Sequence, residues 1–340
     1  MSDQIQPLNY SAHAIEDLVR TAAEWQDMGA LQSARALRGV IELLRTSVKF
    51  ILPNCCNLID PDDLRQTHLD LIRLPYPCVA FEAPWEKEEE GPESVGEFKQ
   101  AKANKRIALC WESNPAFELL PGLNSILNAF PEGGVFVLPI YWGPEAKKWS
   151  VPLGGAFVPY ENTAQRLSMD EALPATRIAN QALIDAGQVK GSALQFRAEP
   201  FVLLPEFHEA ALNTYGSREK AFAQIILDVH DEIMVLVQAC SVLNCANVTT
   251  ADIPPAAALN KKRQASGKQP FFTYKVLQLA DERRGASTGS GGAHGAPRMH
   301  LRRGHLRRLE SKTIWVRPTT VNAGSKLGSV AKDYALSGKA

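Results

Sequence analysis

An apolar stripe in residues 217–243 constrains the fold more than any other feature of the sequence. Apolar side chains recur there at intervals of three and four residues, which places them on one face of a helix. Ser217 is a favourable N-cap residue, and Glu219 puts a negative charge into the first turn. The stripe consists of Phe222, Ile225, Ile226, Val229, Ile233, Leu236, Val237, Cys240 and Leu243. The pattern predicts a long helix at the centre of the core.

Short apolar runs bounded by proline, glycine or charged residues predict strands in the middle of the chain. The expected strands cover residues 78–82, 106–112, 134–142, 149–159 and 194–204. A helix is expected over residues 167–186, and one more strand over residues 270–279. Together these segments predict a mixed or antiparallel sheet.

Helical periodicity also marks residues 11–28 and 31–52, with Gly29 between them and Pro53 at the end. This pattern predicts an antiparallel helical hairpin. The fold class that follows is α+β, with an N-terminal helical hairpin, a mixed sheet packed on a long core helix, and a basic C-terminal β-hairpin module.

A boundary between domains is indicated by the proline- and alanine-rich residues 247–258. We therefore expect a helical hairpin in residues 1–53, an acidic α/β body in residues 54–250 and a basic β-module in residues 251–340.

The composition is that of a globular protein, with 45% hydrophobic and 22% charged residues in a chain of 340. Residues 1–9 do not resemble a secretory signal, and the most apolar segment, residues 233–243, is too short to span a bilayer. We expect a cytoplasmic protein without a membrane partner.

The six cysteines show no disulfide-framework spacing, so reduced and mostly buried thiols are expected. Cys240 and Cys245 could in principle join His300 and His305 around zinc. Both cysteines end an apolar helix, where thiols usually pack as small hydrophobic groups. We expect no metal and no cofactor.

Positive charge is concentrated near the C-terminus, although the whole chain sums to zero. Residues 261–317 contain fourteen Lys and Arg against three Asp and Glu, a net charge of +11, whereas residues 1–260 carry −13. One-sided positive charge is typical of proteins that bind a polyanion.

Within this basic region the chain repeats itself, as His300-Leu301-Arg302-Arg303-Gly304-His305-Leu306-Arg307-Arg308. Gly304 disfavours a helix, and residues 313–316 favour a strand, so we expect a hairpin that turns near Glu310 and Ser311. Positions five apart on a regular strand lie on opposite faces, but a bulge at Gly304 would bring His300 and His305 to one face.

The first hypothesis is a protein that binds nucleic acid, or a nucleoprotein complex, through this basic region. Cations contact the phosphate backbone, and an aromatic ring can stack on bases. The expected nucleic-acid-binding residues are Lys261, Lys262, Arg263, Lys268, Arg298, Arg302, Arg307, Lys312 and Trp315.

A second hypothesis is metal-independent RNA cleavage by the same region. One imidazole of His300 and His305 would take the 2′-hydroxyl proton and the other would protonate the leaving oxygen. Arg303 or Arg308 would stabilise the phosphorane. These four residues are the candidate catalytic residues of a ribonuclease.

A third hypothesis is a protein that acts by contact with another protein, as an inhibitor of a host factor or as a scaffold. Its acidic body would mimic nucleic acid, or would pair with its own arginines. Exposed ion pairs contribute under about 1 kcal/mol each and do not require a repeated His-Leu-Arg-Arg unit.

Other enzyme classes find little support in the sequence. Glu82 and Glu112 each end an expected strand and could form a carboxylate pair for metal-dependent nuclease chemistry. No phosphate-binding Gly-x-x-x-x-Gly-Lys-Ser/Thr, Gly-x-Ser-x-Gly or His-Glu-x-x-His motif is present.

Three blocks of sequence resemble a family of uncharacterised proteins of tailed phages and prophages. The first block is residues 74–82, Leu-Pro-Tyr-Pro-Cys-Val-Ala-Phe-Glu. The second joins residues 243–248 to residues 259–274, and the third covers residues 297–318 together with Lys332-Asp333-Tyr334. The resemblance implies a phage or mobile-element origin and no particular reaction. With it, the first hypothesis becomes a phage or prophage accessory protein that binds nucleic acid in the cytoplasm of the host cell.

Overall fold

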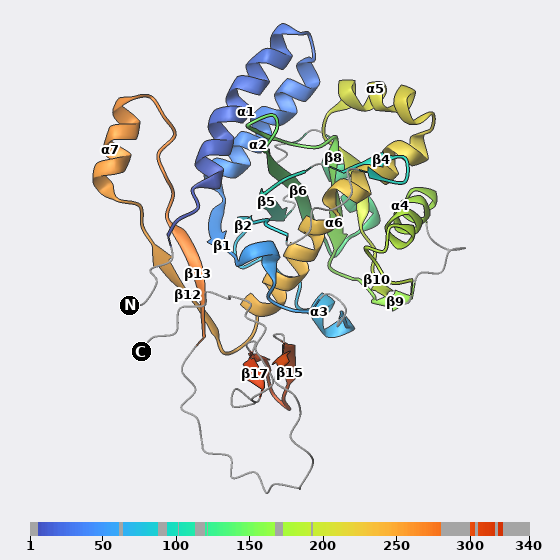
Figure 1. Ribbon diagram of the computed structural model, residues 1–340, viewed down its shortest axis with the longest axis vertical. Coiled ribbons are helices and arrows are strands. Elements are labelled where there is room, and N and C mark those ends of the chain that lie inside the picture. Colours follow the sequence, from blue (N-terminus) through green and yellow to red (C-terminus); the bar gives the residue numbers. More distant parts are fainter. Residues whose placement is uncertain are drawn as a thin grey trace, which may run out of the picture.

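A mixed sheet forms the centre of the protein in the computed structural model (Figure 1). Within the described residues the sheet has nine strands, in the order β11-β8-β6-β5-β2-β1-β13-β12, with β7 paired to β6. The structure describes residues 6–60, 64–87, 94–100, 102–112, 120, 122–166, 173–191, 193–279, 300–302, 305–316 and 319–321. The expected α+β class and mixed sheet are confirmed.

The N-terminal hairpin consists of α1 (Tyr10–Asp27) and α2 (Leu31–Thr46). Gly29 forms the turn with a φ of 85°, a conformation that glycine adopts without strain. The expected continuation of the second helix to residue 52 is wrong, because the backbone becomes extended at Ser47 and residues Val48–Ile51 form β1. This short strand is parallel to both of its neighbours, β2 and β13.

The strands on one side of β1 are antiparallel to one another from β2 onward. They are β2 (Cys78–Pro84), β5 (Lys105–Glu112), β6 (Gly134–Gly143), β8 (Gly154–Pro159) and β11 (Glu199–Val202). The single strand expected over residues 149–159 is two strands, β7 (Lys148–Ser150) and β8.

On the other side of β1, the sheet ends with β13 (Tyr274–Leu279) and β12 (Val248–Ile253). These two strands form an antiparallel ladder of six residue pairs. The domain boundary expected at residue 251 falls within β12. Residues 248–279 thus contribute two strands to the central sheet.

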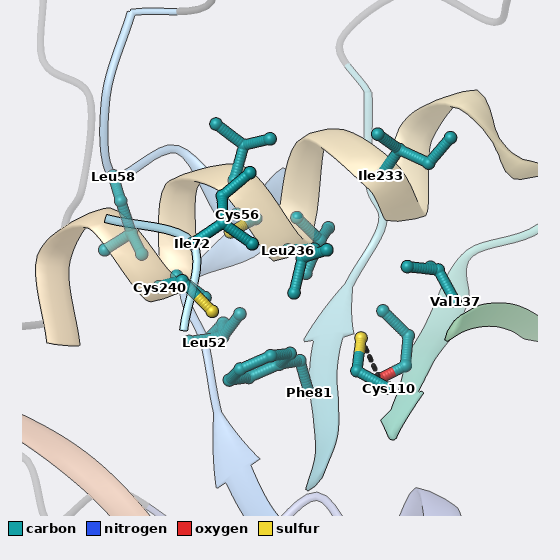
Figure 2. Close-up of a cluster of buried hydrophobic side chains, with 14 of the residues drawn as sticks. Leu52, Cys56, Leu58, Ile72, Phe81, Cys110, Val137, Ile233, Leu236 and Cys240 are labelled. Carbon is teal, nitrogen blue, oxygen red and sulfur yellow. Dashed lines mark hydrogen bonds between the residues drawn. The ribbon is translucent and has the colours of Figure 1, made fainter. Parts of the chain in front are cut away.

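The expected core helix is α6 (Arg218–Leu243), and the Ser217 side chain caps it by accepting a hydrogen bond from the Lys220 amide. The helix lies across one face of the sheet and packs on alternate residues of the strands. Figure 2 shows Ile233, Leu236 and Cys240 of the helix above Phe81 and Cys110 of the sheet. All six cysteines are free thiols.

The opposite face of the sheet is covered by α1 and α2. Their apolar residues form a second core with the other set of alternating strand positions, such as Ala80, Leu109 and Phe136. Consecutive residues of a strand point to opposite faces, so each buried strand supplies both cores. The sheet is therefore the middle of three layers.

Shorter elements surround these layers. The helices are α3 (Gln66–Asp70), α4 (Pro174–Asp185), α5 (Pro205–Tyr215) and α7 (Ala257–Ala265), with 3₁₀ turns η1 (Asn54–Cys56) and η3 (Leu123–Ala129). Two small ladders pair β3 (Ser94–Val95) with β4 (Phe98–Lys99), and β9 (Gln165–Arg166) with β10 (Leu194–Gln195). No helix among the described residues is long and apolar enough to cross a membrane.

Two more ladders lie near the C-terminus. They pair β14 (His300–Arg302) with β17 (Thr319–Val321), and β15 (His305–Arg308) with β16 (Thr313–Val316). The amide of Ala246 donates to the carbonyl of Thr313, which attaches β16 to the segment after α6. The separate basic module expected from the sequence remains a prediction.

Candidate functional site

The first group of expected nucleic-acid-binding residues lies on and beside α7. This helix follows β12, precedes β13 and contains no buried residue. Lys261 and Lys262 are exposed on it, and Lys268 is exposed just after it. We call these three lysines the α7 patch.

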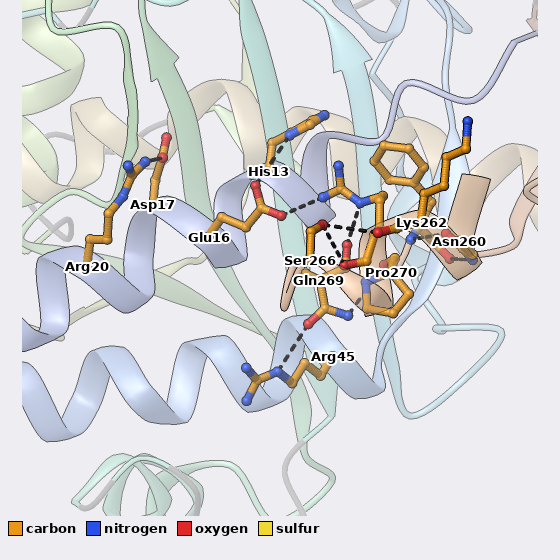
Figure 3. A network of polar contacts seen from close by, with 12 residues as sticks. His13, Glu16, Asp17, Arg20, Arg45, Asn260, Lys262, Ser266, Gln269 and Pro270 are labelled. Carbon is orange, nitrogen blue, oxygen red and sulfur yellow. Dashed lines mark hydrogen bonds and ion pairs between the residues drawn. The ribbon is translucent and has the colours of Figure 1, made fainter. Parts of the chain in front are cut away.

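Arg263, also expected to bind nucleic acid, instead makes contacts within the protein. Its guanidinium group pairs with Glu16 of α1, lies 4.0 Å from the ring centre of Phe271, and donates through Nε to the carbonyl of Gln269 at 2.7 Å. Figure 3 shows how this network joins the α7 segment to α1. Arg263 therefore holds the helix in place, and the three lysines carry the exposed charge.

Two further contacts hold the α7 segment. The Asn260 amide group donates to the carbonyl of Phe271 at 2.9 Å and accepts from its N–H at 2.8 Å. Arg45 of α2 donates to the Gln269 side chain at 3.4 Å. The α7 patch thus belongs to a segment fixed at several points on the body.

The second group of expected residues lies in the β15–β16 hairpin. Arg307, Arg308 and Lys312 are exposed there, and His305 is half-buried. Trp315 is only 2% exposed, and its backbone exchanges hydrogen bonds of 2.8 and 2.9 Å with the Asn247 side chain. Its ring packs into the core below α6, so it presents no open face for stacking on a base. We call the three exposed cations the β15 patch.

The two patches lie at opposite ends of the β12–β13 ladder (Figure 1). Asn247, which holds Trp315, directly precedes the first residue of β12, and α7 follows the last. A ladder of six residues is about 20 Å long. The cations that are close in sequence therefore form two surfaces separated by roughly this distance.

The remaining expected residues cannot be assigned to either patch. His300 and Arg302 belong to β14, where their backbones face Val321 and Thr319 of β17. Arg298, Arg303 and Gly304 lie outside the described residues. The bulge at Gly304 and the shared face of His300 and His305 remain predictions.

Glu82 and Glu112 do not form a carboxylate pair. Glu82 pairs with Ile107 and lies on the same face of the sheet, beneath α1 and α2. Glu112 is two residues after Cys110 in β5, so it lies with Cys110 on the face covered by α6. Glu112 instead accepts a hydrogen bond from Tyr160. The two carboxylates therefore belong to different layers.

Glu82 caps a helix from within the core. It accepts hydrogen bonds from the amides of Tyr10 and Ser11 at the start of α1, at 2.9 and 2.8 Å. The hydroxyls of Ser11 and Tyr274 donate to it at 2.6 and 2.8 Å. Burial raises the pKa of this carboxyl, and the bonds from Ser11, Tyr274 and Tyr10 oppose the shift. Its two oxygens are fully used by the protein.

A pocket that the sequence analysis missed lies between α6 and the ends of β2, β5 and β6. The cavity measures about 330 Å³. Its wall includes Trp85, Lys87, Arg106, Tyr141, Asp228 and Asp231. We call this cavity the acidic pocket, because α6 brings three carboxylates, Asp228, Asp231 and Glu232, to its side.

Arg106 forms ion pairs with two of these three carboxylates. Nη1 of Arg106 lies 3.0 Å from Glu232 and 3.3 Å from Asp231, and its guanidinium group lies 4.9 Å from the ring centre of Trp85. Asp228 accepts a hydrogen bond from the Gln224 amide at 2.8 Å. Asp231 also lies 3.7 Å from the His230 side chain, so Asp228 is the carboxylate of the three without an ion pair among the described residues.

The protonation of the three carboxyls follows from this imbalance. Burial raises the pKa values of Asp228 and Glu232 to about 7 each. The positive charge of Arg106 opposes both shifts. Burial acts on Asp231 too, but the charge of Arg106 overcomes it and lowers the pKa of Asp231. Asp228 in the pocket wall and Glu232 behind it are thus the two carboxyls whose pKa values lie near neutral pH.

A signal for this pocket was present in the sequence. Residues 228, 231 and 232 are separated by the three- and four-residue intervals that share one side of a helix, and α6 is otherwise apolar. Their partner Arg106 is 126 residues away from Glu232, so only the fold brings them together.

No group of three His, Cys, Asp or Glu side chains suited to holding a metal ion is found in the described part of the chain. Comparisons with family models, curated proteins and solved structures find no match for this chain. The two cationic patches and the acidic pocket are the features of the described residues that bear on function.

Proposed function

We propose that the protein binds nucleic acid through the α7 and β15 patches. The observation that carries the proposal is the construction of α7. This helix buries none of its residues, yet Arg263 and Asn260 fix its segment to the body and leave Lys261, Lys262 and Lys268 exposed. A helix that adds nothing to the core but displays a fixed group of cations suits contact with phosphates.

The separation of the patches supports contact with an extended polyanion. About 20 Å along the β12–β13 ladder corresponds to roughly six nucleotide steps of 3.4 Å. One strand of nucleic acid would reach both patches only if it followed this edge of the sheet. The cations would contact the phosphate backbone of the nucleic acid and not its bases, because the buried Trp315 is not placed to stack on a base.

The phage resemblance adds an origin to this proposal: the nucleic acid would belong to a phage, a prophage or the host in whose cytoplasm the protein acts. Cleavage by His300 and His305 with Arg303 or Arg308 depends on a bulge at Gly304, which lies outside the described residues. We therefore propose binding and leave the ribonuclease and the protein-contact inhibitor as outcomes of the test.

The test compares affinity for labelled duplex DNA and single-stranded RNA between about 50 and 200 mM salt, by fluorescence anisotropy. Replacing Lys261, Lys262 and Lys268 by Gln should weaken binding and lower the slope of log K against log salt by about 0.7 to 0.9 per lost contact. Replacing Arg307 and Arg308 by Gln should reduce the slope further.

The matched control replaces Lys147, Lys148 and Lys190 by Gln, which removes the same charge from other exposed positions. This variant should keep the wild-type slope. Equal losses in both triple variants, or an affinity independent of salt, would rule out the proposal. RNA that becomes shorter during the titration in EDTA would favour the ribonuclease, and a partner recovered from nuclease-treated lysate without any binding of nucleic acid would favour the inhibitor.

A further inference from the structure

We propose that the acidic pocket binds a small zwitterion, an amino acid being the common member of this class, with its amine against α6 and its acid group against the opposite wall. The site uses none of the residues of the two cationic patches, and the inference does not depend on nucleic-acid binding.

Acidic groups predominate on the α6 wall of the pocket and cations on the opposite wall, where Glu86 beside Lys87 is the exception. The carboxylates Asp228 and Asp231 come from α6, and Glu232 lies behind them. The cations Lys87, Lys102 and Arg106 come from β5 and from segments that flank it and β2. A pocket that is acidic on one side and basic on the other suits a ligand with both charges.

On the α6 wall, Asp228 has no ion pair among the described residues. Arg106 reaches Glu232 and Asp231 through one nitrogen, whereas the hydrogen-bond donor to Asp228 is the neutral Gln224 amide. An amine beside Asp228 would give this carboxylate a cationic partner and displace the proton that it holds near neutral pH. The carboxylates are not grouped as metal ligands in the described residues, so separate N–H donors of an organic cation fit them better.

The opposite wall has donors without acceptors. The Trp85 indole N–H and the Arg106 Nε–H are buried and have no hydrogen-bond partner among the described residues. Trp85 is 8% exposed and lines the pocket. Buried donors normally find a partner, and two that share one wall need an acceptor nearby. Small shifts of these side chains on binding would turn them toward a carboxylate.

Other charged or titratable groups line the same cavity and bear on how it binds. They are Glu86 and Lys87 after β2, Lys102 before β5, Tyr141 of β6 and His230 of α6. Burial raises the pKa of Tyr141, so its hydroxyl stays protonated and can donate. The volume of about 330 Å³ is within the range of small-molecule sites.

The test begins with thermal shift of the full chain in each of the common amino acids at millimolar concentration, followed by calorimetry of those that raise Tm. Calorimetry in phosphate and in Tris at neutral pH should reveal proton release on binding, because the ligand amine replaces the proton of Asp228. The methyl ester and the N-acetyl derivative of the best amino acid should each bind at least about tenfold more weakly.

Two variants address the two walls. Asp228→Asn keeps an acceptor for Gln224 but removes the charge, so it should weaken binding at least about tenfold and abolish proton release. Trp85→Phe keeps an apolar ring and removes the N–H, so it should weaken the amino acid but not its methyl ester. Asp252→Asn, at an exposed ion pair with Lys275, is the matched control and should bind as the wild type does.

The proposal is overturned if no amino acid raises Tm. It is also overturned if the methyl ester binds as tightly as the parent, because one charge would then suffice. Equal binding by Asp228→Asn and Asp252→Asn would place the ligand elsewhere. Loss of nucleic-acid binding in the lysine variants has no bearing on any of these measurements.

Discussion

Glu82 and Asp228 are buried carboxyls on opposite faces of one sheet, and they differ in what surrounds them. Glu82 lies beneath α1 and receives four hydrogen bonds from three residues of the chain. Asp228 belongs to α6, the helix on the other face, receives a hydrogen bond from Gln224, and borders a cavity of about 330 Å³.

Burial raises the pKa of both carboxyls, so the direction of the shift does not distinguish their roles. What distinguishes the two carboxyls is the number of hydrogen-bond donors that surround each of them. Every donor to Glu82 is placed by folding, which makes it part of the structure. At Asp228 folding places one donor, the neutral Gln224 amide, beside a cavity, which is the arrangement expected where a ligand adds further contacts.

Removing Glu82 should have the largest effect. Glu82→Ala leaves the amides of Tyr10 and Ser11 and the Tyr274 hydroxyl buried without an acceptor, which should lower the free energy of unfolding by about 4 kcal/mol. Urea denaturation measures this loss. If the protein does not fold, the isosteric Glu82→Gln should give a smaller loss in the same direction.

Glu206→Ala is the matched control for Glu82. Glu206 caps α2 as Glu82 caps α1, by accepting from the amides of Gln32 and Ser33, but it is less buried. Its loss should be about 1 kcal/mol, as for an ordinary N-cap. Equal losses in the two variants would contradict the structural role assigned to the buried position of Glu82.

The next largest effect is expected from Arg106→Met, which removes the only arginine among three carboxylates. At about pH 8 the uncompensated charges should cost about 3 kcal/mol of unfolding free energy. At about pH 5 the cost should be smaller, because Asp228 and Glu232, with pKa values of about 7, are then neutral. A cost that does not change with pH would show that Arg106 acts through packing on Trp85 alone.

Asp228→Asn should have the smallest effect, visible in the pH dependence of stability. The pKa of Asp228 is raised in the folded protein, so between about pH 4 and pH 7 the folded state keeps a proton that the unfolded state has lost. Its contribution to stability is therefore greatest at low pH and falls as the pH rises. The variant should reduce the difference in unfolding free energy between about pH 5 and pH 8 by roughly 1 to 2 kcal/mol.

The Asp252→Asn variant checks this result by denaturation at the same two pH values. It replaces a carboxylate that is exposed and paired with Lys275. The pH dependence of the control should match the wild type. A matching curve for Asp228→Asn would indicate that Asp228 is no different from a surface carboxylate.

The sequence predicted the elements whose patterns are long and regular. The apolar stripe of α6 and its Ser217 cap predicted the core helix. The apolar runs of β2, β5 and β6 predicted the middle strands of the sheet. β1 was missed because Val48, Phe50 and Ile51 continue the apolar spacing of α2, so periodicity alone could not show where the helix ends.

The candidate sites were less predictable, for different reasons. The sequence predicted no helix at α7, because the segment is short, polar and unburied, and therefore has no apolar stripe. The burial of Trp315 depends on Asn247 and α6, contacts that no local pattern reveals. The acidic pocket requires Arg106 and α6 to meet across the sheet, and the three carboxylates alone resemble a solvated helix side.

The position of β1 also affects the order of events during synthesis. The strand emerges early but needs β13 to cover its second edge, and Glu82 needs Tyr274 of that strand for its fourth hydrogen bond. At ordinary rates of translation the ribosome takes roughly 10 to 40 s to travel from codon 82 to codon 274. Throughout that interval β1 presents an unpaired edge to other chains, and a delay before β13 emerges would prolong the period in which the nascent protein can associate wrongly.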